Sequence, residues 1–213
     1  MAYFAVNVTP RHERYSRLVA RPPLSDRRKA QTRLEIAQSA LDLFVRDGYD
    51  AVPTEAIAAE AGVSLRTFYR YFQAKEEVLS PIVTRGTETL AARFAARPSD
   101  ETLAEAFAAA FREMRPPEER RRAPRLIPLL TDVPVLRARW LADLRTIEGA
   151  FAMVVKQRTP TPLGDADAEL TGAILATALR IALERAASED ATGVEPAILL
   201  DEILARLRVG GGL

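Results

Sequence analysis

The run from Ala61 to Lys75, AGVSLRTFYRYFQAK, constrains the fold most, because a glycine separates two short helical patterns. In the first pattern, which begins at Thr54, Ile57 and Ala61 recur about one helical turn apart. Gly62 supplies the backbone freedom that a sharp turn needs. Ser64 carries a short side-chain oxygen that can cap the N–H groups opening the second helix. The run therefore predicts two short helices joined by a tight turn.

The second of these helices has a buried side and a side suited to DNA. Leu65, Phe68 and Phe72 recur at three- and four-residue spacing, which predicts burial. The other side mixes arginines with hydroxyls. The guanidinium of Arg66 can bond guanine O6 and N7 together, and hydroxyl groups suit phosphate oxygens. An ordinary helical hairpin with solvated arginines is the alternative, but it does not account for turn, cap and side chains together. The expected DNA contacts are Thr54, Ser64, Leu65, Arg66, Thr67, Tyr69, Arg70, Tyr71 and Lys75, with Arg28, Lys29 and Arg33 upstream.

The spacing in AIAAEAGVSLRTFYRYFQAKEEVL resembles that of the tetracycline-repressor (TetR/AcrR) family of one-component bacterial regulators, over roughly Arg28 to Leu79. The resemblance implies a helical C-terminal domain that dimerises, binds a small molecule and releases DNA when the ligand is bound. One position departs from the pattern. Pro53 stands where the family usually has Ser or Thr; it fits a first helical position but cannot accept a capping bond. Thr54 is expected to take over that phosphate contact.

The charge of the chain is unevenly distributed. Its formal net charge is +1 over 213 residues, of which 48% are apolar, enough to support a core. Up to residue 33, eight basic residues face two acidic ones, so the remainder is net acidic. We expect residues 1–26 to form a mostly irregular basic arm suited to tracking a DNA backbone. A solvated tail without a DNA role is the alternative.

Composition argues against several kinds of site. The chain has no cysteine, and its one histidine, His12, lies in the arm, so neither a metal site nor a Ser-His-Asp arrangement is expected. No Gly-rich phosphate loop is present. We therefore expect no catalytic residues, no metal and no cofactor. Met1 to Val8 is too short for a signal peptide or a membrane span, so a soluble cytoplasmic protein without a membrane partner is expected.

The rest of the chain predicts an all-α fold. A helix is expected from Asp26 or Arg27 to Asp47, and another from near Ala74 towards Phe94 with a kink at Pro81. Further helices are expected after Asp100, which could cap one, after Asp132, and after the break at 159–164; no strand pattern competes. Arg115 to Arg125 predicts a solvated basic turn; a second nucleic-acid surface there is the alternative. The expected domains are an N-terminal three-helix helix-turn-helix DNA-binding domain over 27–73 and a C-terminal helical ligand-binding and dimerisation domain over 74–213.

Aromatic residues in the second domain could form a ligand pocket. The candidate wall residues are Phe107, Phe111, Met114, Leu136, Trp140, Leu144 and Phe151. Ordinary core packing is the alternative. Arg180, inside an apolar stretch, could meet a ligand anion; a salt bridge or an interface contact is the alternative. The stretch from Arg125 to Trp140 also resembles the regulatory domain of those TetR members that are grouped with mycofactocin and acyl-thioester regulators.

The last two helices carry Ala and Leu on more than one face, in ILATALRIAL and AILLDEILARL. Pairing them across a two-fold axis would make a four-helix homodimer interface and hold two recognition helices about 34 to 36 Å apart on a pseudo-palindromic operator. Burial within one chain is the alternative. We therefore predict a dimeric transcriptional regulator that is not an enzyme, most simply a repressor that binds double-stranded operator DNA and is released by a small apolar molecule. The competing hypotheses are a helical hydrolase, for which no nucleophile and base are found, and a ligand-binding or protein-docking bundle that no longer binds DNA.

Overall fold

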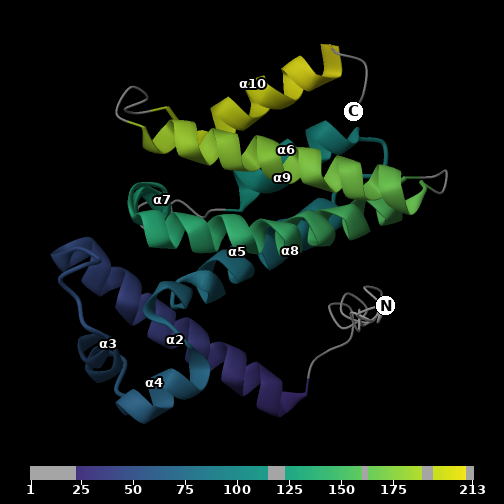
Figure 1. Ribbon diagram of the computed structural model, residues 1–213. Coiled ribbons are helices and arrows are strands. Elements are labelled where there is room, and N and C mark those ends of the chain that lie inside the picture. Colours follow the sequence, from purple (N-terminus) through teal and green to yellow (C-terminus); the bar gives the residue numbers. More distant parts are fainter. Residues whose placement is uncertain (1–22, 115–122, 160–162, 189–193, 210–213) are drawn as a thin grey trace, which may run out of the picture.

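The computed structural model describes residues 23–114, 123–159, 163–188 and 194–209. Throughout these ranges the regular structure is helical, as predicted. Figure 1 shows α2, α3 and α4 grouped on one side, α9 and α10 stacked on the other, and α5 and α8 between them. The helices are α2 (Leu24–Asp47), α3 (Thr54–Glu60), α4 (Leu65–Tyr71), the single 3₁₀ turn η1 (Lys75–Glu77), α5 (Ser80–Ala95), α6 (Leu103–Glu113), α7 (Ala123–Asp132), α8 (Pro134–Arg158), α9 (Asp165–Ala187) and α10 (Pro196–Val209).

Two parts of the sequence interpretation lie largely outside the described residues. The first is the basic arm, of which only residues from 23 onward are described. The second is the basic turn at 115–125, of which residues 115–122 lie outside the described ranges. Within the described residues, no helix is long and apolar enough to cross a bilayer.

The connecting helix begins later than predicted. Instead of one helix from Ala74 kinked at Pro81, the chain makes the short turn η1 and then starts α5 at Ser80. Pro81 therefore lies in the first turn of α5, where a missing backbone N–H leaves no hydrogen bond unmade. The predicted kink is wrong for this reason.

The cap of α6 also differs from the prediction. Thr102, and not Asp100, is the N-cap residue. Its hydroxyl oxygen accepts a hydrogen bond from the Glu105 N–H at 3.3 Å, and the Glu105 carboxylate accepts one from the Thr102 N–H at 3.1 Å. This reciprocal capping box satisfies two backbone donors at once, which a single Asp100 side chain could not do.

The described residues contain two hydrophobic cores. One joins α2, α3 and α4 through Phe44, Phe68 and Phe72, and it also takes in Leu136 and Trp140 from α8. The other lies between α5, α6, α8, α9 and α10. The first core thus extends across residue 74, where the sequence interpretation divided the domains.

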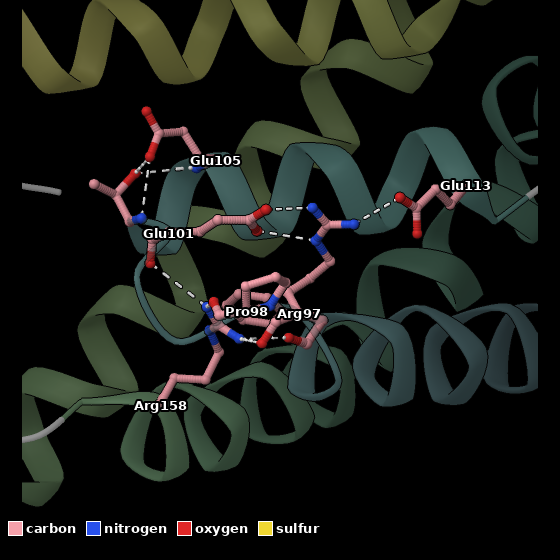
Figure 2. Close-up of polar contacts among 8 residues, drawn as sticks. Arg97, Pro98, Glu101, Glu105, Glu113 and Arg158 are labelled. Atoms are coloured by element: carbon pink, nitrogen blue, oxygen red, sulfur yellow. Dashed lines mark hydrogen bonds and ion pairs between the residues drawn. The ribbon is translucent and has the colours of Figure 1, made fainter.

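Helix α5 is held against α8 at its C-terminal end. The Arg158 guanidinium, at the end of α8, donates to the carbonyl oxygens of Phe94 at 3.2 Å, Arg97 at 2.6 Å and Pro98 at 2.7 Å (Figure 2). A cation bonded to the last carbonyls of a helix also complements its dipole. Arg97 stabilises the loop between α5 and α6 by pairing with Glu101 and, at 2.6 Å, with Glu113 (Figure 2). The hydrogen bonds from Arg97 lower the pKa of Glu101 below its ordinary value.

Helix α9 crosses α8 at very close range. A Cβ atom placed on Gly172 would lie 2.6 Å from both the Ala152 nitrogen and the Glu148 carbonyl oxygen of α8. Only glycine leaves room for two helix backbones to approach this closely, so Gly172 sets the separation of α8 and α9.

Candidate functional site

The turn between α3 and α4 is built as predicted. Gly62 has a φ of 66°, in the left-handed region that favours glycine. Its N–H donates to the Ala59 carbonyl at 3.0 Å, and the Val63 N–H donates to the Ala58 carbonyl at 2.9 Å. These two bonds are those of a Schellman motif, which satisfies the last carbonyls of α3 while the chain reverses direction.

Ser64 caps α4, as its position predicted. Its hydroxyl oxygen accepts from the Thr67 N–H at 3.1 Å, and its O–H donates to the Thr67 hydroxyl oxygen at 2.9 Å. Both hydroxyl groups take part in the cap. A phosphate bound by either residue would therefore contact a hydroxyl that is already hydrogen-bonded in the cap. The Thr67 hydroxyl keeps its own proton for such a contact.

Helix α4 presents a cationic side to solvent over an aromatic side in the core. Phe68 and Phe72 are fully buried and Leu65 is half-buried. Arg66 and Arg70 are exposed. Two tyrosines complete the helix: Tyr69 is exposed, and Tyr71 is half-buried with the Arg70 guanidinium 5.1 Å from its ring centre. The structure therefore brings Arg66, Tyr69 and Arg70 together on one accessible face.

Two of the cations predicted to contact DNA have partners inside the protein. The Arg33 guanidinium lies 5.0 Å from the centre of the Phe72 ring. The Lys75 ammonium donates to the Tyr49 carbonyl oxygen and lies 4.0 Å from the Tyr49 ring centre. Burial lowers the pKa of Lys75. Arg33 and Lys75 thus support the position of α4, whatever contact they make with DNA, whereas Arg28 and Lys29 are exposed near the start of α2.

Pro53 directly precedes α3, whereas the sequence interpretation placed it at the first helical position. It is the N-cap residue of α3 and provides no side-chain cap, while Thr54 is the first helical residue and is half-buried. The Pro53 carbonyl oxygen accepts from the N–H groups of Ala56 at 3.1 Å and Ile57 at 3.3 Å. Helix α3 therefore forms without a capping side chain.

A cavity of about 120 Å³ lies between α5, α6, α7, α8 and α9. Four of the seven predicted wall residues line it: Phe111, Met114, Trp140 and Leu144. The lining residues not predicted come mainly from α5, α7 and α9: Ile82, Val83, Gly86, Thr87, Leu90, Leu126, Ile127, Leu130, Ile147, Ala176, Leu179 and Leu183. Arg180, which the sequence suggested as a possible ligand contact, is the one charged residue of the lining.

The other three predicted wall residues do not line this cavity. Phe107 and Phe151 are fully buried and pack edge to face with ring centres 4.9 Å apart, so they fill space behind the wall. Leu136 belongs to the core that it shares with α2, α3 and α4. The signal that sequence reasoning missed was the apolar stripe of α5, from Ile82 and Val83 to Leu90, which was not among the predicted wall residues.

Charge at the cavity is concentrated on Arg180. Its Nη1 donates to Glu184 Oε2 at 2.6 Å, so the salt bridge considered as an alternative is present. Arg180 also lines the cavity. The other Glu184 oxygen, Oε1, is buried, makes no hydrogen bond within the described residues and lies 3.9 Å from Arg137 Nη2.

The cavity and helices α2, α3 and α4 share a wall. Trp140 lines the cavity and also belongs to the core that holds Phe68 and Phe72. One residue earlier in α8, Arg139 pairs with Glu77 of η1 at 3.2 Å, and Glu77 accepts from the Gln73 N–H at 3.0 Å, two residues beyond α4. A movement of the cavity wall can therefore reach the end of α4 through packed and hydrogen-bonded groups.

The same part of α8 holds the start of α5. Asp143 accepts from the Ser80 hydroxyl at 2.8 Å and pairs with Arg139 at 3.0 Å.

In the described part of the chain, no group of three or more His, Cys, Asp or Glu side chains is placed to hold a metal ion.

Comparison with known proteins matches both parts of the chain to family models. Residues 36–81 match the model described as bacterial regulatory proteins of the tetR family. Residues 98–211 match the MftR C-terminal domain. The second match covers the stretch from Arg125 to Trp140 that suggested such a regulatory domain.

Curated relatives are regulators as well. The chain is 30% identical to the HTH-type transcriptional regulator TcmR of Streptomyces glaucescens over 152 residues, which is 68% of this chain and 67% of that protein. It is 34% identical to the HTH-type transcriptional repressor KstR of Rhodococcus jostii over 70 residues, a third of each chain.

Solved structures share the fold. FadR of Thermus thermophilus, a TetR-family repressor in complex with lauroyl-CoA, superposes with a TM-score of 0.53 at 26% identity, over 85% of this chain and 95% of that one. A TetR-family regulator from Mesorhizobium loti superposes with a TM-score of 0.52 at 20% identity, over 87% and 99% of the two chains.

Proposed function

The chain belongs to the TetR family of bacterial regulatory proteins, and from that premise we propose that it is a dimeric repressor released from a pseudo-palindromic operator by a small apolar molecule. Regulators of this family bind operator DNA and dimerise. The observation that carries the proposal is the shared wall at Trp140, which links an apolar cavity to the core beneath the recognition helix.

Base reading is assigned to the exposed face of α4. Arg66, in the first turn of the helix, is exposed, and its planar fork suits guanine O6 and N7 in the major groove. Tyr69 and Arg70 lie exposed beside it and suit phosphate oxygens. Phe68 and Phe72 fix the orientation of this face because both are fully buried.

Dimerisation is assigned to α9 and α10. Both carry large apolar side chains exposed to solvent, namely Leu170 on α9 and Ile198 and Leu207 on α10, with exposed fractions of 61%, 52% and 37%. Exposed apolar surface on adjacent helices is typical of an interface between copies. A symmetric pairing there would set the spacing of two α4 helices along DNA.

Release is assigned to the unequal attachment of α5 to α8. The cavity lies between the two helices, so a ligand that enlarges it must strain their connections. At the far end Arg158 makes three hydrogen bonds shorter than 3.3 Å, whereas the end near the DNA-binding helices is held by one hydrogen bond from Ser80 to Asp143 and by the pair of Arg139 with Glu77. Movement would therefore concentrate near Glu77 and α4. An effector with an apolar part is also supported by the FadR structure, whose ligand, lauroyl-CoA, carries an apolar acyl chain.

The experiment that tests the DNA function is selection of bound duplexes from a random library, followed by salt-dependent gel shifts. Arg66→Ala is expected to relax base preference at one operator position and to weaken specific binding by about 1 to 3 kcal/mol. Arg145→Ala, an exposed arginine on α8, is the matched control and should leave binding unchanged. Equal losses on specific and random DNA for Arg66→Ala would refute base reading. A library that yields no bound sequence would favour the alternative of a bundle that no longer binds DNA.

A further inference from the structure

We propose that the cavity takes an uncharged ring compound bearing a carbonyl group, whose oxygen accepts a hydrogen bond from Arg180. This inference deepens the proposed function, on which it rests for its regulatory consequence. Binding itself can be measured without DNA, so the two can fail separately.

Arg180 is the one charged residue of the lining and the strongest hydrogen-bond donor there for a polar ligand. Apart from Arg180 and Thr87, the one side-chain nitrogen or oxygen among the residues that line the cavity is the neutral indole N–H of Trp140. The Thr87 hydroxyl donates to the Val83 carbonyl oxygen at 3.0 Å, so its proton is already used. A ligand therefore meets a mostly apolar surface with one charged residue, Arg180, in its lining.

Arg180 has donors to spare. A guanidinium carries five N–H groups in a fixed fork. Nη1 donates to Glu184 at 2.6 Å, and within the described residues Nη2 and Nε donate to no other group. An acceptor atom on a ligand can take one of these free N–H groups without displacing Glu184.

Charge balance favours a neutral acceptor over an acid. Glu184 already compensates the charge of Arg180, and both side chains are mostly shielded, with exposed fractions of 22% and 24%. A ligand carboxylate would add a second negative charge beside Glu184 in a poorly solvated place, which is unfavourable. Arg137 offsets this weakly, because it lies 3.9 Å from Glu184 and is itself 54% exposed. An ammonium would instead face the Arg180 guanidinium. A carbonyl oxygen avoids both conflicts.

The size of the cavity suits a ligand, or a part of a ligand, of about one ring. The cavity has a volume of about 120 Å³. An apolar cavity of about 150 Å³ admits benzene. Cyclohexanone is therefore a suitable probe, with cyclopentanecarboxylate, cyclohexylammonium and cyclohexene as probes of similar size that carry an anionic, a cationic and no polar group.

Trp140 gives a direct measurement. It is the only tryptophan of the chain and it lines the cavity, so its emission reports occupancy. Titration of the full chain with each probe, checked by calorimetry, should show cyclohexanone binding at least about fivefold more tightly than cyclohexene or cyclopentanecarboxylate, as expected for a hydrogen bond to a charged donor.

Two variants separate charge from shape. Glu184→Gln removes the compensating charge and should reverse the preference, so that cyclopentanecarboxylate binds more tightly than cyclohexanone. The double variant Arg180→Met with Glu184→Gln removes the pair together, avoids an unpaired buried carboxylate, and should abolish the advantage of cyclohexanone over cyclohexene. Arg145→Met, at an exposed position of α8, is the control and should behave as the wild type.

The ranking decides the outcome. Cyclopentanecarboxylate or cyclohexylammonium binding as tightly as cyclohexanone to the wild type overturns the proposal, as does an unchanged ranking in Glu184→Gln. No binding of any ring probe also overturns it. Tight binding of cyclohexanone without loss of operator affinity supports the ligand class and contradicts release by ligand, which belongs to the proposed function.

Discussion

Replacing Gly172 by alanine tests whether the crossing of α8 and α9 is as close as the structure has it. The new Cβ atom would lie 2.6 Å from the Ala152 nitrogen and the Glu148 carbonyl oxygen, whereas ordinary contact begins at 3.4 Å, so α9 must retreat by about 0.8 Å. Backbone atoms of a helix cannot move singly. The retreat therefore loosens the packing between α8 and α9. Overpacking of this kind costs about 1 to 3 kcal/mol or more in the free energy of unfolding.

The same change gains helix propensity, which must be subtracted. Glycine inside a helix is about 1 kcal/mol less favourable than alanine. Gly86→Ala is the matched control, because Gly86 is also inside a helix but nothing lies within 4 Å of an added Cβ. We expect Gly86→Ala to raise the free energy of unfolding by up to about 1 kcal/mol and Gly172→Ala to lower it by up to about 2 kcal/mol. Urea unfolding at one fixed protein concentration measures both. Equal midpoints for the two variants would refute the close crossing.

Three further predictions concern the cavity, its link to α4 and the α5–α6 loop. Gly86→Leu should place a side chain in the cavity, so gel shifts should show operator binding retained and ligand-induced release lost. Arg139→Ala removes the pair with Glu77; ligand binding followed by Trp140 emission should persist while the ligand-induced fall in operator affinity shrinks by at least about fivefold, and an unchanged fall would exclude this link. Because Arg97 lowers the pKa of Glu101, the folded state takes up that proton less readily than the unfolded chain, so the stabilisation is present above the ordinary glutamate pKa of about 4.3 and is lost as the pH falls through the lower folded value. The Tm advantage of the wild type over Glu101→Gln should therefore shrink between about pH 6 and about pH 3, and a constant difference would contradict this assignment.

The helix-turn-helix could be predicted because its signals are local. The turn depends on Gly62 and on bonds between residues a few positions apart, and the cap of α4 depends on Ser64 and Thr67. Spacing alone also separated buried Phe68 from exposed Arg66. Short-range rules are sufficient wherever the partners are neighbours in the chain.

The cavity could be predicted only in part because its walls depend on how distant helices meet. Aromatic periodicity identified Phe111 and Trp140, but it could not tell them from Phe107 and Phe151, which have the same spacing and fill the core instead. The periodicity of α5 indicated an apolar face, but it did not show that the neighbouring helices would leave part of this face uncovered at a cavity. That depends on the separation of the helices, which no local pattern records.

The internal partners of Lys75 and Arg33 could not be predicted for a related reason. A cation beside a recognition helix suits a phosphate, and the sequence offers no sign that the carbonyl of Tyr49, 26 positions away, lies within reach. The ring of Phe72 likewise meets Arg33 only after α2 and α4 have packed. In both cases a tertiary contact engages a side chain that local rules assign to solvent.

The core beneath the recognition helix has a consequence for recombination between relatives. It includes Leu130 of α7 and Leu136 and Trp140 of α8, side chains encoded well after the DNA-binding segment ends. A crossover in the gene near residue 79 would give the N-terminal helices a foreign set of these three neighbours, and with them a foreign set of core contacts. The heritable unit of DNA recognition is therefore discontinuous: it consists of residues 24–79 together with a short distant patch, and a chimaeric sensor must transplant both.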